Sequence, residues 1–333
     1  MSLREQLQAR LDGKAKPVGS LGRIEALAVQ LGMIQGTLAP QVVDPVVLVF
    51  AGDHGAAGAV SAYPAAVTAA MVGAYLGGRA AVNLFAGQAG ARLVVVDAGV
   101  AAALPAQAGL VDAKVRAGTR DWRHGPAMTA AELDQAMQRA ADLVDGLADG
   151  GCTVLALGEM GIGNTASAAL LAHKVAGLDL AVLTGRGAGL DDAGLARKQA
   201  AMAAGAARTG PGLAPHAALA EYGGYEVAML AAAILRGAER RMCVVVDGVI
   251  VTAAAVLAHA IQPGCVACCV FAHRSAERGH DAMLAHLGAV PLLDLGMRLG
   301  EGTGAALALP LLRAAAAVLA DMADMADLQD LVA

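Results

Sequence analysis

Short apolar runs alternate along the chain with longer segments in which apolar residues recur every three or four positions. The short runs predict buried strands, and the segments between them predict helices. One such helix, at 129–147, begins with Thr129 and Glu132 at the spacing of a capping box. The predicted strands lie at 46–51, 93–96, 153–157, 180–183, 243–246 and 266–271. Strands that alternate with helices indicate an α/β fold with a parallel sheet covered by helices on both faces.

Both ends of the chain predict helices without strands. Residues 1–36 carry two apolar stripes at helical spacing, separated by the turn sequence 16–20, in which Ser20 is a suitable helix N-cap. The tail at 307–331 is rich in alanine and also predicts helix. The two terminal segments can therefore pack together as a small lobe beside the sheet.

The composition predicts a core built from small side chains. Apolar residues make up 57% of the 333 residues and glycine contributes 42, whereas aromatic residues reach only 2%. The stretch 248–272 has no charged residue and is long enough to span a membrane. His259, Gln262 and Pro263 interrupt it, so a helix followed by a turn and a strand is the better interpretation, and we expect no membrane partner.

Charge and cysteine content suit a cytoplasmic protein without a nucleic-acid partner. A formal net charge of −5 gives no general attraction to nucleic acid, so we expect no nucleic-acid partner. The charged N-terminus lacks the apolar core of a signal peptide. The five cysteines show no framework spacing, which suits a reducing compartment.

Cys265 and Cys268, with His273 and His280 downstream, superficially resemble a zinc site. Both cysteines fall in the apolar run read as a strand, where residues three apart point to opposite faces. Free cysteine is commonly buried as a small apolar residue. We therefore expect structural thiols and no metal.

The stretch 158–165, Gly-Glu-Met-Gly-Ile-Gly-Asn-Thr, lies between a predicted strand and a helix-forming run. A glycine loop at a helix start points free backbone N–H groups at an anion, and glycine allows close approach. Glu159 would repel a phosphate, so we expect it to face a neutral or cationic part of a ligand. A tight turn without a ligand is the alternative interpretation.

Gly161, Gly163 and Ala166 also fit the dinucleotide-binding pattern G-x-G-x-x-G/A, so a nicotinamide-dependent dehydrogenase is an alternative. That fold needs an acidic residue after the next strand. The next predicted strand ends instead before Arg186, which suits a 2′-phosphate but weakens the dehydrogenase interpretation.

A second glycine loop holds one carboxylate, Glu301, between Gly300 and Gly302, directly before a predicted helix. Such a carboxylate is accessible to a ligand, although an acidic residue at a helix start also has a structural explanation. Three predicted strands end in aspartate, at Asp53, Asp97 and Asp247, where parallel sheets commonly bind ligands but where aspartate also stabilises turns. The basic run 273–280 suits a phosphate or a solvated loop.

These motifs occur together in one known family. The sequences at 16–23, 52–55, 60–64, 158–165, 185–187 and 297–302 appear in order. With them the chain resembles the nicotinate-nucleotide–dimethylbenzimidazole phosphoribosyltransferases, the CobT family of cobalamin synthesis, from about residue 14 to the C-terminal helix.

The resemblance implies transfer of the phosphoribosyl group of nicotinate mononucleotide to 5,6-dimethylbenzimidazole, giving α-ribazole 5′-phosphate and nicotinate, with no cofactor and no metal. It also implies a Rossmann-like sheet, a small helical lobe from both chain ends and a homodimer. The parts it implies are an N-terminal segment 1–36, an α/β domain 37–304 and a C-terminal segment 305–333.

The resemblance further assigns the site residues. Glu301 would be the catalytic base and Glu159 a second carboxylate that can share this role. The benzimidazole pocket would be lined by Ser61, Tyr63, Met71 and Met160. The nucleotide would be held by Gly161, Gly163, Asn164, Thr165, Gly185, Arg186, Gly187, Lys198, His273, Arg274, Ser275, Gly300 and Gly302. A nucleotide-binding module without catalysis stays as an alternative, and the preferred acceptor base is open.

Overall fold

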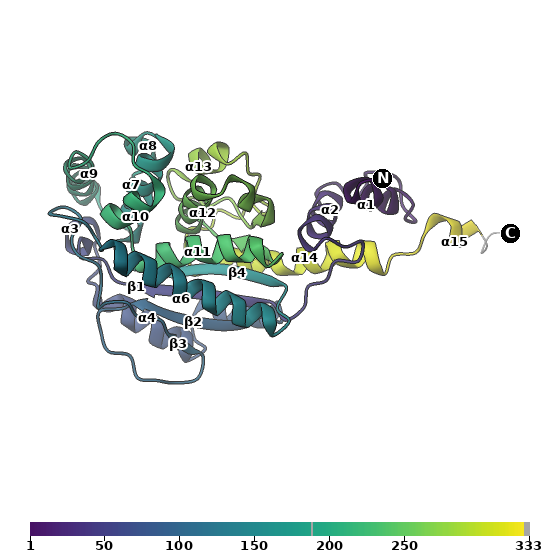
Figure 1. The fold of residues 1–333 in the computed structure, drawn as a ribbon, viewed down its shortest axis with the longest axis horizontal. Coiled ribbons are helices and arrows are strands. Elements are labelled where there is room, and N and C mark those ends of the chain that lie inside the picture. The colour runs from purple at the N-terminus through teal and green to yellow at the C-terminus, as the bar shows by residue number, and fades with distance from the viewer. Residues whose placement is uncertain (188, 330–333) are drawn as a thin grey trace.

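A parallel sheet of six strands runs through the middle of the computed structural model, which describes residues 1–187 and 189–329 (Figure 1). Its order is β3-β2-β1-β4-β5-β6, and every neighbouring pair is parallel. The direction of strand order reverses between β1 and β4, where doubly wound folds bind ligands. The strands are β1 (Val46–Gly52), β2 (Arg92–Gly99), β3 (Leu110–Asp112), β4 (Val154–Met160), β5 (Cys243–Val246) and β6 (Cys269–Phe271).

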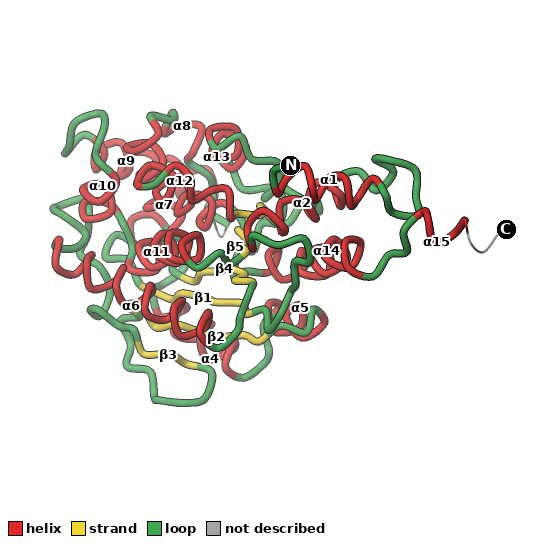
Figure 2. Tube along the Cα trace, turned by 45° about the vertical axis from the view of Figure 1, so that its right-hand side comes forward, coloured by secondary structure: helices red, strands yellow, loops and turns green. Residues whose placement is uncertain are grey.

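Helices cover both faces of the sheet, and each face has its own apolar core (Figure 2). On one face α11 contacts β1, β2, β4 and β5, and further helices pack over it. This layer contains α6 (Ala130–Asp149), α7 (Asn164–Ala176), α10 (Pro215–Tyr222), α11 (Tyr225–Glu239) and α12 (Val249–Ile261). The opposite layer contains α2 (Arg23–Gln35), α4 (Ala66–Leu76), α5 (Ala81–Gln88) and α14 (Thr303–Ala320).

Strand β1 shows why the central strands read as continuous apolar runs. Val46, Leu48 and Phe50 lie in one core, whereas Val47 and Val49 lie in the other. Successive side chains of a strand point to opposite faces, so a strand covered on both sides must be apolar at every position. The predicted α/β sheet with helices on both faces is confirmed, as is the capping box that begins α6 at Thr129.

The strand predicted at 180–183 is wrong: these residues form the short helix α8 (Leu180–Leu183). The side chain of Asp179 accepts a hydrogen bond from the Ala181 N–H and starts this turn, and Leu183 is the buried member of the run. Val182 is 43% exposed, which a central strand does not allow. The edge strand β3 was missed because it has only three residues.

The strand predicted at 266–271 is too long. A 3-10 helix, Pro263–Cys268, occupies its first half, and only β6 pairs with β5. Cys265 and Cys268 therefore lie in a helical turn, so the argument from opposite strand faces was wrong, although both thiols are free and buried. Ser20 does not cap a helix either. Helix α2 begins at Arg23, and its N-cap is Gly22. The φ of Gly22 is 53°, a value that glycine adopts more easily than a residue with a side chain.

The two ends of the chain pack against each other at one end of the molecule (Figure 1). Lys14, just after α1 (Leu3–Asp12), forms an ion pair of 3.0 Å with Asp324, and the Met325 N–H donates to the Gly13 carbonyl at the start of α15 (Met325–Gln329). Residues 330–333 of the predicted tail lie outside the described residues. The division of the chain into three parts stays a prediction.

Helix α14 is long and apolar enough to cross a membrane by length and composition alone. In this fold 56% of it is buried, and it packs on β4 and β5 as well as on α2. Its apolar side chains are thus accounted for by the core of the protein.

Candidate active site

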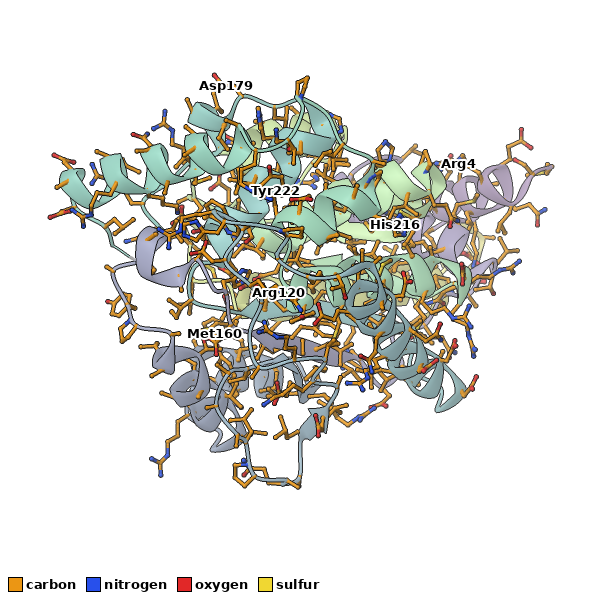
Figure 3. The ribbon with its side chains drawn as sticks, turned by 60° about the vertical axis from the view of Figure 1, so that its left-hand side comes forward. Arg4, Arg120, Met160, Asp179, His216 and Tyr222 are labelled. Atoms are coloured by element: carbon orange, nitrogen blue, oxygen red, sulfur yellow. The ribbon has the colours of Figure 1, made fainter. Side chains whose placement is uncertain are left out.

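A cavity of about 550 Å³ lies at the carboxyl end of β4, beside the first residues of α7, α12 and α14. Met160, the last residue of β4, lines it, and β4 contacts α4 there; Figure 3 labels Met160 among the drawn side chains. Many residues predicted for the site also line it. They are Tyr63, Met71, Glu159, Met160, Gly161, Asn164, Thr165, Gly187, Ser275, Gly300 and Glu301.

Glu301 lies on a loop whose backbone is left-handed at three consecutive residues. The φ angles of Gly300, Glu301 and Gly302 are 82°, 65° and 83°. A left-handed glutamate is uncommon, and such residues cluster at functional sites. The loop rests directly on β4, because a Cβ added to Gly158 would lie 2.5 Å from the Gly302 nitrogen and 2.6 Å from the Glu301 carbonyl carbon. Gly158 is therefore required for this close approach.

Asp247, the residue after β5, anchors the same loop. Its carboxylate accepts hydrogen bonds of 3.0 Å from the N–H groups of Gly302 and Ala305. A carboxylate at a helix N-terminus satisfies free donors and interacts favourably with the helix dipole. Asp247 thus fixes both the start of α14 and the position of Glu301.

Glu159 is buried and accepts a short hydrogen bond from the side-chain amide of Asn164. Burial, with the charges of Asp247, Glu226 and Glu301, raises the pKa of Glu159 to about 8. Its Oε1 lies against Gly300, because a Cβ there would be 2.5 Å away. Glu159 therefore touches the loop of Glu301, and its neutral form predominates near pH 7.

Burial also raises the pKa of Glu301; the Tyr75 hydroxyl opposes this rise, and the charge of Asp247 adds to it. Tyr75 lies on α4 and is 2% exposed. Burial and the two glutamates raise the pKa of its phenol well above the ordinary value, which keeps it neutral. A carboxylate with a raised pKa in such surroundings is suited to proton transfer near neutral pH.

Two helix N-termini open on the cavity. Helix α7 follows Gly163 and α12 follows Gly248, and neither of these glycines can supply a capping side chain. Free N–H groups and the helix dipole favour an anion at such positions. The cavity thus combines buried carboxylates with helix N-termini that attract negative charge.

Lys198, on α9 (Asp192–Ala206), lies directly behind the cavity wall. Its Nζ donates to the Thr165 hydroxyl at 2.8 Å, and a Cβ at Gly187 would lie 3.7 Å from it. Burial lowers the pKa of Lys198 to about 8, although Glu277 opposes this. Thr165 and Gly187 separate the ammonium group from the cavity that they line.

The other predicted site residues lie outside the cavity lining. They are Ser61, Gly163, Gly185, Arg186, Lys198, His273, Arg274 and Gly302. Arg186 forms an ion pair with Asp192 and donates to the Leu190 carbonyl. Arg274 forms an exposed ion pair of 2.9 Å with Asp281. These two arginines are engaged at the surface.

Gly163 and His273 have supporting positions. Gly163, with φ 96°, is the N-cap of α7, and its Cα packs against α3 (Ala57–Val60). His273 is buried with its Nε2 3.5 Å from Asp247, and neither ring nitrogen makes a hydrogen bond to a described residue. Ser61 accepts a hydrogen bond from the Tyr63 N–H and shapes the turn before α4.

Sequence reasoning missed the first turn of α12 as a wall of the cavity. Gly248 and residues 249–251 line it, together with Glu277 and Arg298. The sequence showed Asp247 and Gly248 at the end of a strand, but the apolar residues after them gave no indication of a binding site. Arg298 is exposed, and among the described residues that line the cavity it alone has a basic side chain.

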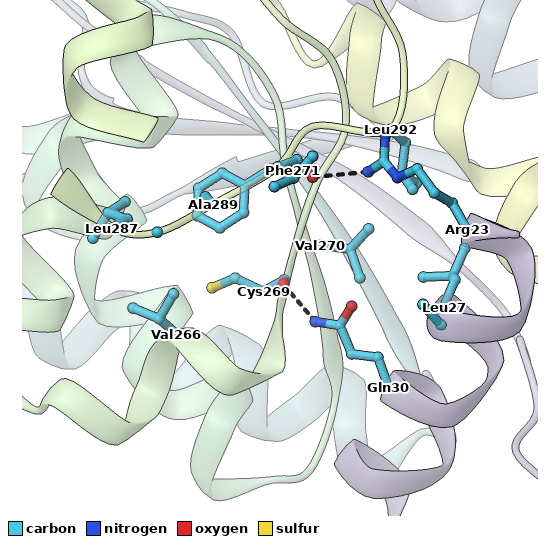
Figure 4. Close-up of a pocket in the computed structure, with 13 residues that line it drawn as sticks. Arg23, Leu27, Gln30, Val266, Cys269, Val270, Phe271, Leu287, Ala289 and Leu292 are labelled. Atoms are coloured by element: carbon cyan, nitrogen blue, oxygen red, sulfur yellow. Dashed lines mark hydrogen bonds between the residues drawn. The ribbon is translucent and has the colours of Figure 1, made fainter. Parts of the chain in front are cut away.

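A second cavity of about 320 Å³ lies between α2, β6 and the segment 287–292 (Figure 4). Its polar groups have partners: Gln30 donates to the Cys269 carbonyl at 2.8 Å, and Arg23 donates to the carbonyls of Val290 and Pro291. These bonds attach α2 to the edge of the sheet. These hydrogen bonds give the polar groups of the second cavity a structural role, and the Cys269 thiol that lines it is buried.

The zinc site and the dinucleotide-binding site considered in the sequence analysis can be compared with this geometry. Among residues 1–187 and 189–329, no three His, Cys, Asp or Glu side chains are grouped as metal ligands. The dehydrogenase pattern needs an acidic residue that faces a ribose after the next strand. That strand is β5, and Asp247 after it caps α14.

Sheet order, glycine loop and adjoining buried carboxylates define a doubly wound α/β enzyme, and a family model described as "Phosphoribosyltransferase" matches residues 1–329. The nicotinate-nucleotide–dimethylbenzimidazole phosphoribosyltransferase of Aromatoleum aromaticum is 56% identical over 95% of this chain and 92% of its own. The chain belongs to the nicotinate-nucleotide–dimethylbenzimidazole phosphoribosyltransferase family, which confirms the family resemblance of the motifs.

Further relatives agree. The enzyme of the same name from Ralstonia nicotianae is 54% identical over 96% of this chain and 91% of its own. The crystal structure of CobT from Thermus thermophilus superposes with a TM-score of 0.94 at 43% identity and covers 98% of both chains.

Proposed function

We propose that this protein transfers the phosphoribosyl group of nicotinate mononucleotide to 5,6-dimethylbenzimidazole, releasing nicotinate and forming α-ribazole 5′-phosphate. The observation that carries this proposal is the buried Glu301 carboxylate, on a left-handed loop beside the first turns of α7 and α12. Membership of the phosphoribosyltransferase family supports the reaction class and its small-molecule substrates.

In the proposed mechanism Glu301 removes the proton from one ring nitrogen of the benzimidazole. The other nitrogen attacks C1′ of the ribose, and the bond between C1′ and the nicotinate nitrogen breaks. The bonding electrons return to the ring, so a pyridinium leaves as a neutral pyridine ring. Attack on the face opposite the leaving group converts the β-linkage to α. Positioning and a base suffice for this step.

Glu159 and Glu301 are expected to work in different protonation states. Burial raises the pKa of Glu159 to about 8, and the charges of Asp247, Glu226 and Glu301 add to this rise. A neutral Glu159 can donate a hydrogen bond, whereas the base must be charged before it accepts a proton. Two carboxylates whose environments separate their pKa values are a common acid–base arrangement.

The direct test is an assay with purified protein, nicotinate mononucleotide and dimethylbenzimidazole. We expect nicotinate and α-ribazole 5′-phosphate in equal amounts, with the anomer assigned by NMR. Binding of the nucleotide without nicotinate release with any azole acceptor would identify a non-catalytic module instead. Parallel reactions with other azoles and with adenine would define the preferred acceptor.

Lys198→Met should weaken nicotinate mononucleotide binding by about 10-fold, because it removes a buried positive charge behind Thr165. Wild-type affinity should fall as the pH rises through about 8, where the Lys198 ammonium loses its proton. The variant should lack this pH dependence. Calorimetry between pH 7 and 9.5 measures both effects.

Arg186→Ala is the matched control for the loss of a cation. Its guanidinium pairs with Asp192 at the surface, so nucleotide affinity should change less than 2-fold. A larger loss in Arg186→Ala than in Lys198→Met would assign the nucleotide contact to Arg186.

Family membership also supports a homodimer in the cytoplasm. Exposed apolar side chains such as Val18 (71% exposed) and Leu84 (62% exposed) fit a surface that is covered in an assembly. Light scattering on the purified protein should give twice the mass of the 333-residue chain. A monomer at micromolar concentration would contradict this part of the proposal.

A further inference from the structure

A fully buried chain of three polar side chains lies behind the glycine loop of the cavity. His54, in the loop after β1, places Nε2 2.6 Å from Oε1 of Glu226 and Nδ1 3.1 Å from the Ser167 hydroxyl. The His54 and Glu226 side chains are 0% exposed, as is Ser167. The mechanism above gives His54 and Ser167 no role, and Glu226 enters it only as one of the charges that raise the pKa of Glu159.

The arrangement has the connectivity of a serine hydrolase triad but not its accessibility. Ser167 lies in the second turn of α7, is fully buried and does not line the active-site cavity, so no substrate carbonyl can reach its hydroxyl. A nucleophile must approach the reacting atom within about 3 Å. The three residues must therefore act through what they pack against.

Their contact with the active site runs through Gly161. A Cβ added to Gly161 would lie 3.4 Å from His54 Nε2 and 2.5 Å from the Gly52 carbonyl oxygen. Gly161 lines the cavity, so the imidazole lies immediately behind its wall. The same Cβ position is 3.4 Å from the Asn164 amide, which holds Glu159.

The protonation state of His54 depends on the charged groups around it. Glu226 comes from the first turn of α11, and a Cβ at Gly52 would lie 2.7 Å from its Oε2, so the carboxylate is enclosed by backbone. Burial acts to lower the pKa of His54, but Glu226 and Asp53 outweigh it and the pKa is raised. The raised pKa favours the protonated imidazole, whose Nε2 would lie 3.4 Å from a Cβ at Gly161.

We propose that the His54–Glu226 pair is a positioning device of the nucleotide site, with its positive end behind Gly161 to stabilise the anionic nucleotide held in front of that residue. This inference rests on the proposed function, because it takes nicotinate mononucleotide as the ligand. Neither residue touches the substrate, and both act through the loop that begins at Gly161. The pair also fixes this loop relative to the end of β1.

The test compares two variants as a function of pH. Glu226→Gln keeps the shape of the side chain but removes the charge that keeps His54 protonated, so buried His54 becomes neutral at pH 8. Because both charges of the pair are then lost, nicotinate mononucleotide should bind about 3-fold more weakly than to wild type, as expected for the loss of an oriented ion pair rather than of a net charge. As the pH is lowered and His54 regains its proton, the dissociation constant of the variant should fall relative to that of wild type.

His54→Gln is the matched control, because it cannot carry a charge at any pH. Its affinity should fall at least as far as that of Glu226→Gln, because the buried Glu226 carboxylate is left without its cationic partner, and no protonation at position 54 can restore the affinity as the pH is lowered. The groups that face His54 are Glu226 from α11, Asp53 from the same loop and the uncharged Ser167 from α7. Ratios to wild type cancel the titration of the nucleotide phosphate, and repeating the comparison in a Glu159→Gln background removes the effect of Glu226 on the pKa of Glu159.

NMR of wild-type protein with ¹⁵N-labelled histidine adds a measurement that needs no variant to fold. We expect both ring nitrogens of His54 to carry protons at pH 7. A neutral His54, or a Glu226→Gln ratio that does not change with pH, would overturn the inference. If the wild-type protein binds no nicotinate mononucleotide, the proposed function fails and the inference fails with it. If the wild-type protein binds the nucleotide and turns it over, a ratio of dissociation constants that does not change with pH contradicts the inference alone.

Discussion

Glu301→Gln should lower kcat by roughly 10²- to 10⁴-fold, the range typical of a positioned proton transfer. Glutamine keeps the size of the side chain and can hydrogen-bond, but it cannot take the acceptor proton. In wild type, kcat/KM should rise with pH as the raised pKa of Glu301 is passed, and this limb should disappear in the variant. Nicotinate mononucleotide affinity should change little, because the base acts on the acceptor.

Glu159→Gln and the double variant separate the two carboxylates. If Glu301 alone is the base, the single Glu159 variant keeps most of the rate and the residual product of Glu301→Gln is still the α-anomer. If the glutamates share the proton, each single variant loses little and only the double variant loses most of the rate. Turnover close to wild type in all three variants would remove both carboxylates from the mechanism.

Gly158→Ala should be damaging out of proportion to the single methyl group it adds. The new Cβ would lie 2.5 Å from the Gly302 nitrogen and 2.6 Å from the backbone of Glu301, and backbone cannot swing aside as a side chain can. Overpacking of this kind costs about 1–3 kcal/mol of unfolding free energy. A displaced Glu301 should also lower kcat by about 100-fold, as misplacement near 1 Å commonly does.

Gly146→Ala, in the exposed interior of α6, is the control. No atom lies within 4 Å of the added Cβ, and alanine in a helix is favoured over glycine by about 0.5–1 kcal/mol. Denaturant unfolding and steady-state kinetics should therefore show a slightly more stable protein with unchanged kcat. Wild-type kcat in a folded Gly158→Ala protein would show that the loop of Glu301 does not depend on contact with β4.

The sheet was predictable because its central strands are buried on both sides and so carry long apolar runs. Strand β1 is apolar at every position for this reason. The run at 180–183 failed because four apolar residues fit one helical turn as well as a strand, and the Asp179 cap decided between them. Strand β3 could not be found, since three residues have no measurable period.

The parts of the candidate site that consist of glycines and carboxylates were predictable from the sequence. The loops of Glu159 and Glu301 are distant in sequence, yet they touch because β4 and α14 lie side by side. The first turn of α12 escaped notice because it contributes backbone and apolar side chains, which look the same wherever they occur. The pair of His54 and Glu226 depends on a contact between residues 172 positions apart, which one sequence does not reveal.

Asp247 determines two properties of this enzyme, the stability of α14 and the pH range in which the two glutamates work. Its carboxylate holds the N-terminus of α14, and its charge raises the pKa of both Glu159 and Glu301. A substitution that removes both the charge and the hydrogen-bond acceptor therefore loosens the helix and shifts the working pH range toward acid in the same step. An engineer who wants a lower pH optimum from this scaffold must accept lower thermal tolerance, or must restore the helix cap with a neutral acceptor such as asparagine.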